Sequence, residues 1–315
     1  MTKTVHNTFT IAGFFVTFIG AILFSTKAII VKLAFANTAL DALTLLTLRM
    51  LFSLPFYLAA AWIGSSNKSN VKFTKAQWVN IISLGLFGYY LSSLFDFVGL
   101  QYISAGLERL ILFLYPTFVV LINAFLFKEK ISRIQQLALL LTYAGIAIAY
   151  WGELDIDSSN KNFFWGSFLI FLCAVTYASY IVGSGRMIPK VGVTKFTAYA
   201  MLSSTAGVFI HFLLSGNSKS LDHIGTYWLY GLVLAIIATV IPTFLISIGM
   251  KRIGSNNVAI ISGIGPVSTI VQAYFILGEK IFPAQIAGTI LVVAGVLLIG
   301  WKTAGQDTKN LEQTR

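Results

Sequence analysis

The chain has 315 residues, of which 57% are hydrophobic and only 10% are charged. Soluble domains usually carry about 25% charged residues, so this composition excludes a protein with a fully water-facing surface. The formal net charge of +11 does not indicate a nucleic-acid-binding protein, because the Lys and Arg residues stand in short groups between apolar runs.

Ten apolar segments follow one another along the chain, each close to the length of about 20 residues that a helix needs to cross a bilayer. They cover residues 10–34, 42–64, 77–100, 105–127, 133–151, 163–184, 196–215, 227–250, 256–277 and 283–301. Long aliphatic stretches without period-two alternation argue against a transmembrane barrel. We therefore predict an all-α integral membrane protein of about ten transmembrane helices, with an unstructured polar cytoplasmic tail at 303–315.

The distribution of Lys and Arg predicts the orientation of these helices. With the N-terminus placed in the cytoplasm, fifteen of the 22 basic residues fall in cytoplasmic segments and three fall outside. Cytoplasmic loops of membrane proteins carry an excess of Lys and Arg. We therefore predict a multi-pass protein of the plasma (inner) membrane with both termini in the cytoplasm.

The two halves of the chain are related by an offset of 150 residues. Between 99–151 and 249–301, thirteen of 53 aligned positions are identical without a gap. The identical pairs include Pro116/Pro266, Glu129/Glu279 and Trp151/Trp301. We predict two five-helix repeats, 10–152 and 163–302. Because five is odd, the repeats cross the membrane in opposite senses, as in many secondary transporters that bind substrate between their halves.

Ionisable residues inside the predicted helices are candidates for substrate binding or coupling, because such side chains are expensive in a bilayer. They are Lys27, Arg49, Asp96, Glu108 and Arg109. A structural ion pair is the alternative role for each, and Asp96 has two candidate partners, Lys27 and Arg49. Glu108 and Arg109 are adjacent and point about 100° apart on a helix.

The charges also predict the chemistry of a ligand. With Lys32, which we expect to reach toward the membrane interface, four cations stand against two acids. An anionic or zwitterionic ligand would balance the excess. Arg49 is the best candidate to hold its carboxylate, because a guanidinium forms two parallel hydrogen bonds with a carboxylate.

Aromatic and proline residues add further candidates. The cavity-lining candidates are Tyr89, Tyr115 and Tyr177. Pro116 and Pro266 occupy equivalent places in the fourth and ninth helices, and proline removes a backbone hydrogen bond from a helix. We predict that both helices bend there as hinges beside one shared cavity; packing alone is the competing explanation.

Three parts of the sequence resemble the EamA family of the drug/metabolite transporter superfamily. Residues 102–109, YISAGLER, running on to Leu114-Tyr115-Pro116, are similar to its fourth helix. Residues 127–131 (FKEKI) and 277–281 (LGEKI) resemble its repeated leucine-glycine-glutamate boundary before the fifth and tenth helices, with Lys128 in place of the glycine. Arg49 stands where the family commonly has an arginine in its second helix.

The resemblance covers roughly residues 10–302. It implies ten helices, cytoplasmic termini, a central cavity and secondary transport, often export of amino acids or related metabolites. We therefore favour a secondary transporter that exports a small polar metabolite, such as an amino acid, by alternating access. Its expected partners are that substrate and the lipid bilayer, with Asp96 and Glu108 as candidates for proton coupling.

Two other function classes remain as alternatives. A membrane-embedded enzyme is the first, although the sequence lacks the HExxH, G-x-S-x-G and Walker A motifs. A non-transporting receptor or channel is the second. We expect no enzyme activity, cofactor, metal site or nucleic-acid partner, and the sequence does not define the oligomeric state.

Overall fold

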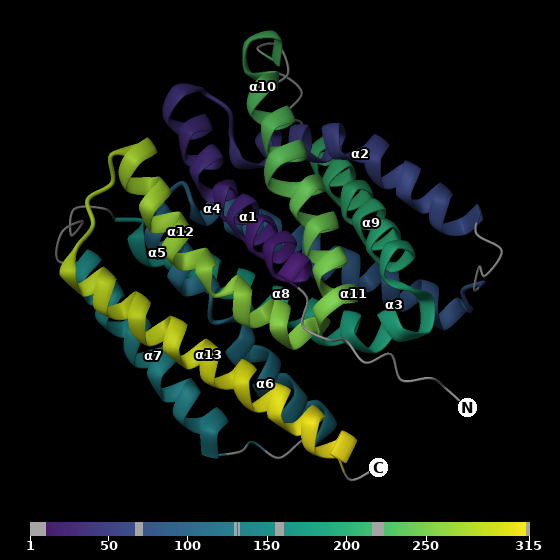
Figure 1. The fold of residues 1–315 in the computed structure, drawn as a ribbon. Helices are drawn as coiled ribbons and strands as arrows, with labels where there is room; N and C mark the ends of the chain where they lie inside the picture. Colours follow the sequence, from purple (N-terminus) through teal and green to yellow (C-terminus); the bar gives the residue numbers. More distant parts are fainter. Residues whose placement is uncertain are drawn as a thin grey trace.

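A computed structural model describes residues 11–66, 72–128, 131, 133–154, 161–215 and 224–312, which form an all-helical bundle (Figure 1). Within these residues, seven helices are long and apolar enough to cross a membrane, and three shorter apolar helices complete ten spans. The predicted fold class, an all-α membrane protein of about ten helices, is confirmed.

The first half of the chain supplies spans one to five. Its elements are α1 (Ile11–Asn37), α2 (Ala42–Ser66), α3 (Lys75–Gly85), the π-helical segment η1 (Leu86–Leu91), α4 (Ser92–Gly99), α5 (Ala105–Leu112), α6 (Tyr115–Phe127) and α7 (Arg133–Leu154). The third span is continuous through α3, η1 and α4. The fourth span is interrupted at residues 113–114, between α5 and α6.

The second half supplies spans six to ten. Its elements are α8 (Phe163–Val191), α9 (Val193–Leu214), α10 (Ile224–Ala235), the π-helical segment η3 (Ile236–Val240), α11 (Ile241–Ser262), α12 (Ile264–Gln272), the π-helical segment η4 (Ala273–Leu277) and α13 (Pro283–Glu312).

Several predicted boundaries differ from the structure in this half. Helical structure continues through residues 251–255, where we predicted a connection between spans eight and nine. The prediction of an unstructured tail is wrong for residues 303–312, which belong to α13. This stretch is polar but contains no proline, and Ala304, Lys309 and Leu311 favour helix. Residues 313–315 lie outside the described part of the chain.

The helix pairs that pack between the two halves are symmetric, as expected of two related repeats. α2 packs along α9, and α7 packs along α13, which joins span two to seven and span five to ten. α1 packs along α11 while α4 packs along α8, which joins span one to eight and span three to six. If each span is replaced by its equivalent in the other half, the pairs two–seven and five–ten are unchanged, and the pair one–eight becomes the pair three–six. The two halves therefore interleave in one bundle, in which α7 and α13 lie side by side (Figure 1).

Equivalent positions in the two halves also share unusual backbone conformations. The π-helical segments η1 and η3 begin at Leu86 and Ile236, which are 150 residues apart in the sequence. The fourth and ninth spans end at the left-handed residues Lys128 (φ 56°) and Gly278 (φ 69°), which have the same offset. The repeat therefore extends from residue identities to backbone geometry.

Glycines bring the α7 and α13 backbones close together. A Cβ atom on Gly145 would lie 2.6 Å from the carbonyl oxygen of Gly288, and one on Gly288 would lie 2.4 Å from that of Gly145. Real side chains do not tolerate such distances, so both positions require glycine. Small residues allow membrane helices to pack this closely.

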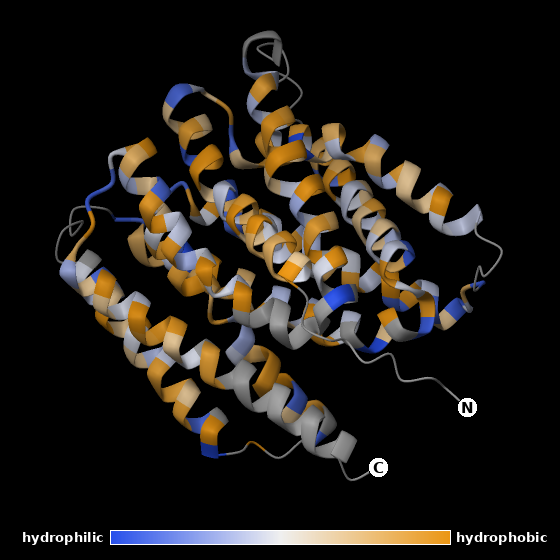
Figure 2. Cartoon of the chain, in the orientation of Figure 1, coloured by the Kyte–Doolittle hydropathy of each residue, from blue (hydrophilic) through white to orange (hydrophobic). Residues whose placement is uncertain are grey.

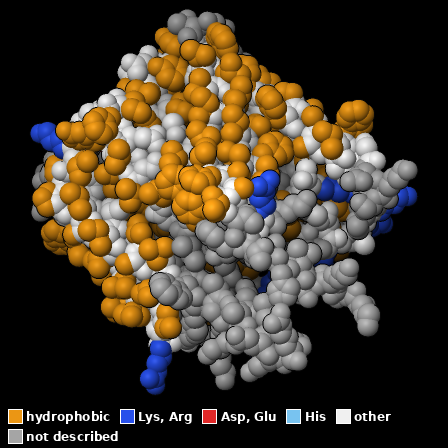
Figure 3. Space-filling model, viewed as in Figure 1, with side chains coloured by type: hydrophobic (Ala, Val, Ile, Leu, Met, Phe, Trp, Pro, Cys, Tyr) orange, Lys and Arg blue, Asp and Glu red, His pale blue; other side chains and the backbone are white. Residues whose placement is uncertain are grey.

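The exterior of the bundle is apolar. Figure 2 shows hydrophobic residues along the helices and hydrophilic residues mainly near helix ends, and Figure 3 shows hydrophobic side chains over much of the described surface in that view. Large side chains are strongly exposed, including Trp62 (75%), Trp151 (68%) and Phe275 (78%). Soluble monomers rarely expose apolar surface on this scale. Contact with lipid explains it.

Candidate functional site

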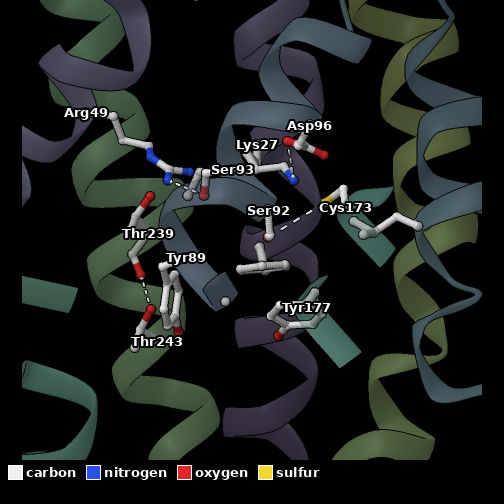
Figure 4. Close-up of a pocket in the computed structure, with 14 residues that line it drawn as sticks. Lys27, Arg49, Tyr89, Ser92, Ser93, Asp96, Cys173, Tyr177, Thr239 and Thr243 are labelled. Carbon is white, nitrogen blue, oxygen red and sulfur yellow. Dashed lines mark hydrogen bonds and ion pairs between the residues drawn. The ribbon is translucent and has the colours of Figure 1, made fainter. Parts of the chain in front are cut away.

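A pocket lies within the bundle between the two halves, and Figure 4 shows the side chains that line it. Its wall includes residues of α1, α2, η1, α4 and α5 from the first half, and of α8, η3 and α11 from the second. The charged residues of the wall are Lys27, Arg49 and Asp96, all from the first half. The second half contributes hydroxyl groups from Tyr177, Thr239 and Thr243, and the thiol of Cys173. The pocket is therefore charged on one side and neutral on the other.

The repeat positions much of this wall. Four pairs of residues separated by 150 positions line the pocket: Lys27/Tyr177, Gly88/Ala238, Tyr89/Thr239 and Ser93/Thr243. Two of these pairs lie on the π-helical segments η1 and η3. An inserted π turn shifts the residues that follow it around the helix, and such turns occur frequently at functional sites. The matched π segments thus present equivalent small and polar residues to the same cavity.

Lys27 lies between two buried carboxylates. Its Nζ atom is 2.8 Å from Oδ2 of Asp96 and 3.5 Å from Oε1 of Glu108. The side chains are buried, with exposed fractions of 8% for Lys27, 1% for Asp96 and 0% for Glu108. Of the two partners considered for Asp96, the structure places Lys27 against it. Both oxygens of Glu108 lack a hydrogen-bond donor.

Arg109 has partners other than Glu108 and Lys27, although it follows Glu108 directly in the sequence. Its Nη2 atom donates a hydrogen bond to Oγ of Ser25 at 3.3 Å. Its guanidinium carbon lies 5.5 Å from the ring centroid of Phe24. Two adjacent residues of one helix therefore reach two different places on α1. Arg109 does not line the pocket.

Arg49 has neutral neighbours. Its Nη2 atom donates a 2.8 Å hydrogen bond to Oγ of Ser93, and its guanidinium carbon lies 4.9 Å from the ring centroid of Phe97. The residue is 4% exposed, and Nε has no hydrogen-bond partner. Across the described part of the chain, no carboxylate lies within ion-pair distance of it. Figure 4 shows the guanidinium beside Ser93, apart from the Lys27–Asp96 pair.

The tyrosine candidates divide between the pocket wall and the layer behind it. Tyr89 and Tyr177 line the pocket, whereas Tyr115 does not. The ring of Tyr115 packs edge-on against Tyr177 with centroids 5.0 Å apart, and Tyr89 packs similarly against Tyr180 at 4.8 Å. These contacts fix the orientation of the two rings that face the cavity.

The prolines do not line the pocket. α6 begins at Tyr115, so the interruption of span four precedes Pro116, and α12 begins at Ile264, shortly before Pro266. No described residue of α12 belongs to the pocket wall. α12 packs against α1 and α5, two helices that contribute residues to the wall. The role of the two prolines as hinges stays a prediction.

Lys32 reaches the connection between the third and fourth spans. Its Nζ atom donates hydrogen bonds to the carbonyl oxygens of Leu100 (3.2 Å) and Ile103 (2.9 Å). These carbonyls follow the end of α4, where backbone acceptors lack helical partners. The charge of Lys32 therefore stabilises the connection between α4 and α5.

Glu279 of the second half caps a helix of the first half. Its carboxylate oxygens accept hydrogen bonds from the backbone N–H groups of Ala105 (3.0 Å) and Gly106 (3.4 Å). These residues begin α5. The first N–H groups of a helix lack internal partners, and the helix dipole favours a negative charge there. This contact ties α5, which carries Glu108, to the end of span nine.

Sequence reasoning missed the serine and threonine hydroxyl groups of the wall. Ser93 binds Arg49, and Oγ1 of Thr243 donates to the carbonyl of Thr239 at 2.6 Å while lying 3.4 Å from the hydroxyl of Tyr57. Serine and threonine are common in membrane helices, so residue type gives no signal. The available signal was the offset of 150 residues between Ser93 and Thr243.

Comparisons with known proteins agree with this architecture. The sequence profile of the EamA-like transporter family matches residues 11–151 and 164–301, which correspond to the two halves. The chain is similar to the uncharacterized transporter YcbK of Bacillus subtilis (strain 168), with 32% identity over 305 residues, 94% of this chain and 96% of that protein. The WAT1-related protein At5g07050 of Arabidopsis thaliana is 25% identical over 272 residues, 74% of this chain and 67% of that protein.

A solved crystal structure shares the fold. It superposes with a TM-score of 0.64 at 22% sequence identity, over 91% of this chain and 96% of the other. At this identity the likeness concerns the fold alone.

Proposed function

The chain belongs to the EamA-like transporter family and is a multi-pass membrane transporter, and on this basis we propose that it exports an amino acid or a close derivative by alternating access. The excess of Lys and Arg in alternate connections supports a plasma-membrane orientation with both termini in the cytoplasm. The proposed substrate is a zwitterion, and the pocket between the two halves is its proposed binding site.

The observation that carries the substrate assignment is the environment of Arg49. The buried Arg49 guanidinium faces the pocket, donates to the Ser93 hydroxyl, lies over the Phe97 ring and retains an unused donor at Nε, while Asp96 stands beyond ion-pair distance within the described residues. An uncompensated buried charge is strongly unfavourable. A substrate carboxylate would supply the missing charge and accept two parallel hydrogen bonds from the guanidinium.

The opposite wall suits the substrate's ammonium group. Tyr89 and Tyr177 present aromatic rings and hydroxyls to the pocket, and a ring face attracts a cation. Asp96 Oδ1 accepts no hydrogen bond within the described residues, so it offers an acceptor to the same ammonium. The wall is thus complementary to a small molecule with one carboxylate and one ammonium group.

The repeat supports alternating access as the mechanism. Equivalent residues of the two halves line one pocket, and the interhelical contacts are preserved when the halves are exchanged. If the halves exchange conformations, an opening on one side of the membrane becomes an opening on the other.

The test is the variant Arg49→Gln, reconstituted in proteoliposomes after size-exclusion chromatography has shown that it folds. We expect exchange of the best amino acid from a radiolabelled panel to fall at least about tenfold. A hydrogen bond to a charged group contributes about 1.5–3 kcal/mol, and about 1.4 kcal/mol corresponds to a factor of ten in affinity.

Arg186→Gln is the matched control, because it removes the same charge from an exposed residue of α8. Its exchange rate should equal that of the wild type. Unchanged exchange in a well-folded Arg49→Gln protein would remove Arg49 from the site and leave the substrate assignment without its support.

A further inference from the structure

We propose that Glu108 is the proton carrier of this transporter and that Lys27 switches between Asp96 and Glu108 as substrate and proton replace each other. This inference rests on the proposed function, because it concerns the same pocket. It deepens that function by assigning proton antiport as the driving reaction and by naming the group that takes the proton.

The argument begins with the balance of charge around Lys27. One ammonium group stands within ion-pair distance of two carboxylates, and the closer one, Asp96 at 2.8 Å, takes its main interaction. Glu108, at 3.5 Å, is 0% exposed and accepts no hydrogen bond. Two ionised carboxylates around one cation in a buried site repel each other strongly. A proton on Glu108 removes the second negative charge.

Among the described residues, Lys27 is the cation within ion-pair distance of Glu108, and Arg109 is the second cation whose charge acts on it. α4 contributes Asp96, α8 contributes Cys173 and Tyr177 across the pocket, and Arg109 of α5 is engaged by Ser25. α12 has no titratable residue, and those of α13 lie beyond residue 301. On α7, Tyr150 packs against Phe163 at 5.1 Å, and Tyr143 is 43% exposed. In the described part of the chain, Lys27 is therefore the cation paired with Glu108.

Binding of the substrate is what moves Lys27 and releases the proton from Glu108. In the empty pocket the Lys27 ammonium pairs with ionised Asp96, and Glu108 holds its proton. A substrate ammonium that binds Asp96 displaces Lys27, which then pairs with Glu108. Glu108 itself does not line the pocket, whereas Lys27 and Asp96 do. The O–H bond of Glu108 breaks, its proton leaves past these two side chains to water in the pocket, and the carboxylate keeps the electron pair. When the substrate is a zwitterion, the net charge of the site falls by one, which is the charge of the proton released.

The geometry requires little movement for this exchange. Lys27 already lies 3.5 Å from Glu108, so a small displacement of its Nζ atom replaces one ion pair by the other. This switch of ion pairs involves the first half of the protein alone. The equivalent positions in the second half are Tyr177, Ile246 and Val258, which cannot form these ion pairs. One proton then enters for each substrate that leaves.

The experiment compares two transport modes of the same proteoliposomes. Exchange of labelled for unlabelled amino acid without a pH gradient reports binding and alternation. Uphill movement driven by a pH difference of about one unit reports coupling and should sustain about a tenfold substrate gradient for one-to-one antiport. We expect Glu108→Gln to lose the tenfold gradient, and the pH dependence of whatever exchange remains to disappear with it. Asp41→Asn is the matched control, because Asp41 caps α2 through Thr44 and asparagine caps equally well.

A second measurement uses binding alone. Addition of the exchanged amino acid to purified wild-type protein in weak buffer should release protons, detected with a pH-sensitive dye, and Glu108→Gln should release none. Asp96→Asn provides a second variant: it leaves Lys27 with Glu108 as its one acidic neighbour, so it should also lose gradient-driven transport.

The outcomes separate this inference from the proposed function. Wild-type protein that exchanges an amino acid but ignores the pH gradient would overturn the proton assignment and leave the proposed function standing. Gradient-driven transport that survives in Glu108→Gln would overturn it as well. Wild-type protein that exchanges no amino acid of the panel would overturn the proposed function, and the proton assignment with it.

Discussion

At the scale of single residues, Lys128 is the clearest local exception in the structure. It ends α6 in the left-handed conformation, with a φ of 56°, at the place that Gly278 occupies in the second half with a φ of 69°. A side chain in this region is unfavourable because its Cβ approaches the neighbouring carbonyl oxygen. Glycine has no such contact and is the usual residue after a helix C-terminus.

We therefore predict that Lys128→Gly stabilises the protein by about 1 kcal/mol. The measurement is the midpoint of thermal unfolding in detergent, followed by the fluorescence of the protein's tryptophans. Gly278→Lys is the reciprocal variant and should lower the midpoint. A drop in the midpoint for Lys128→Gly would mean that the Lys128 side chain makes a contact worth more than the strain it causes.

The residues of the site differ in how far the sequence could identify them. Charge inside an apolar run was sufficient to find Lys27, Arg49 and Asp96, since such residues are rare in membrane helices. Which charges pair depends on the rotation and depth of two separate helices, and the sequence left two partners open for Asp96. The contact from Arg49 to Ser93 lay beyond prediction, because hydroxyl residues are too common to stand out.

At the scale of helices, the matched π-helical segments explain why the pocket lies where it does. η1 and η3 each bring a small residue, Gly88 or Ala238, to the cavity wall. A Cβ on Gly88 would lie 2.2 Å from Cβ of Tyr180, so glycine also allows α8 to approach. A hydrophobicity pattern reports that a span exists. It does not report one additional residue in a turn, so these segments were not predicted.

The packing of α7 on α13 gives a second prediction. Gly288→Val should weaken this interface, because its Cβ would meet the Gly145 carbonyl at 2.4 Å. Overpacking of this kind costs about 1–3 kcal/mol. The control is Ile290→Val on the same helix, where the side chain is 63% exposed. The midpoint of thermal unfolding in detergent should fall clearly for Gly288→Val and hardly change for the control; equal midpoints would contradict the close contact.

At the scale of the whole molecule, the fold was predictable because its two strongest signals are global. Apolar length defines the spans, and the offset of 150 residues defines the halves. The interruption of span four at residues 113–114 and the helical continuation through 251–255 were not predictable from these signals. The continuation through 251–255 occurs where apolar and polar residues mix over a few positions, so that packing decides the boundary there. The interruption at 113–114 lies in an apolar run directly before Pro116, where we predicted a bend.

The orientation of the whole bundle gives a prediction of its own. In a protein whose native Cys173 is replaced by serine, Asn37→Cys should react with a membrane-impermeant thiol reagent on intact cells, since the positive-inside rule places the end of α1 outside. Lys72→Cys should react only after permeabilisation. Asn37 and Lys72 are both exposed, so accessibility within the protein does not separate them. The reverse labelling pattern would invert the topology.

The cap that Glu279 places on α5 also has a consequence for how the chain is made. Synthesis proceeds from the N-terminus, so α5 emerges from the ribosome about 170 residues before its capping carboxylate does. Until span nine has been inserted, the first N–H groups of α5 lack this partner at the edge of the membrane. The helix that carries Glu108 therefore reaches its final environment only when the second half is almost complete.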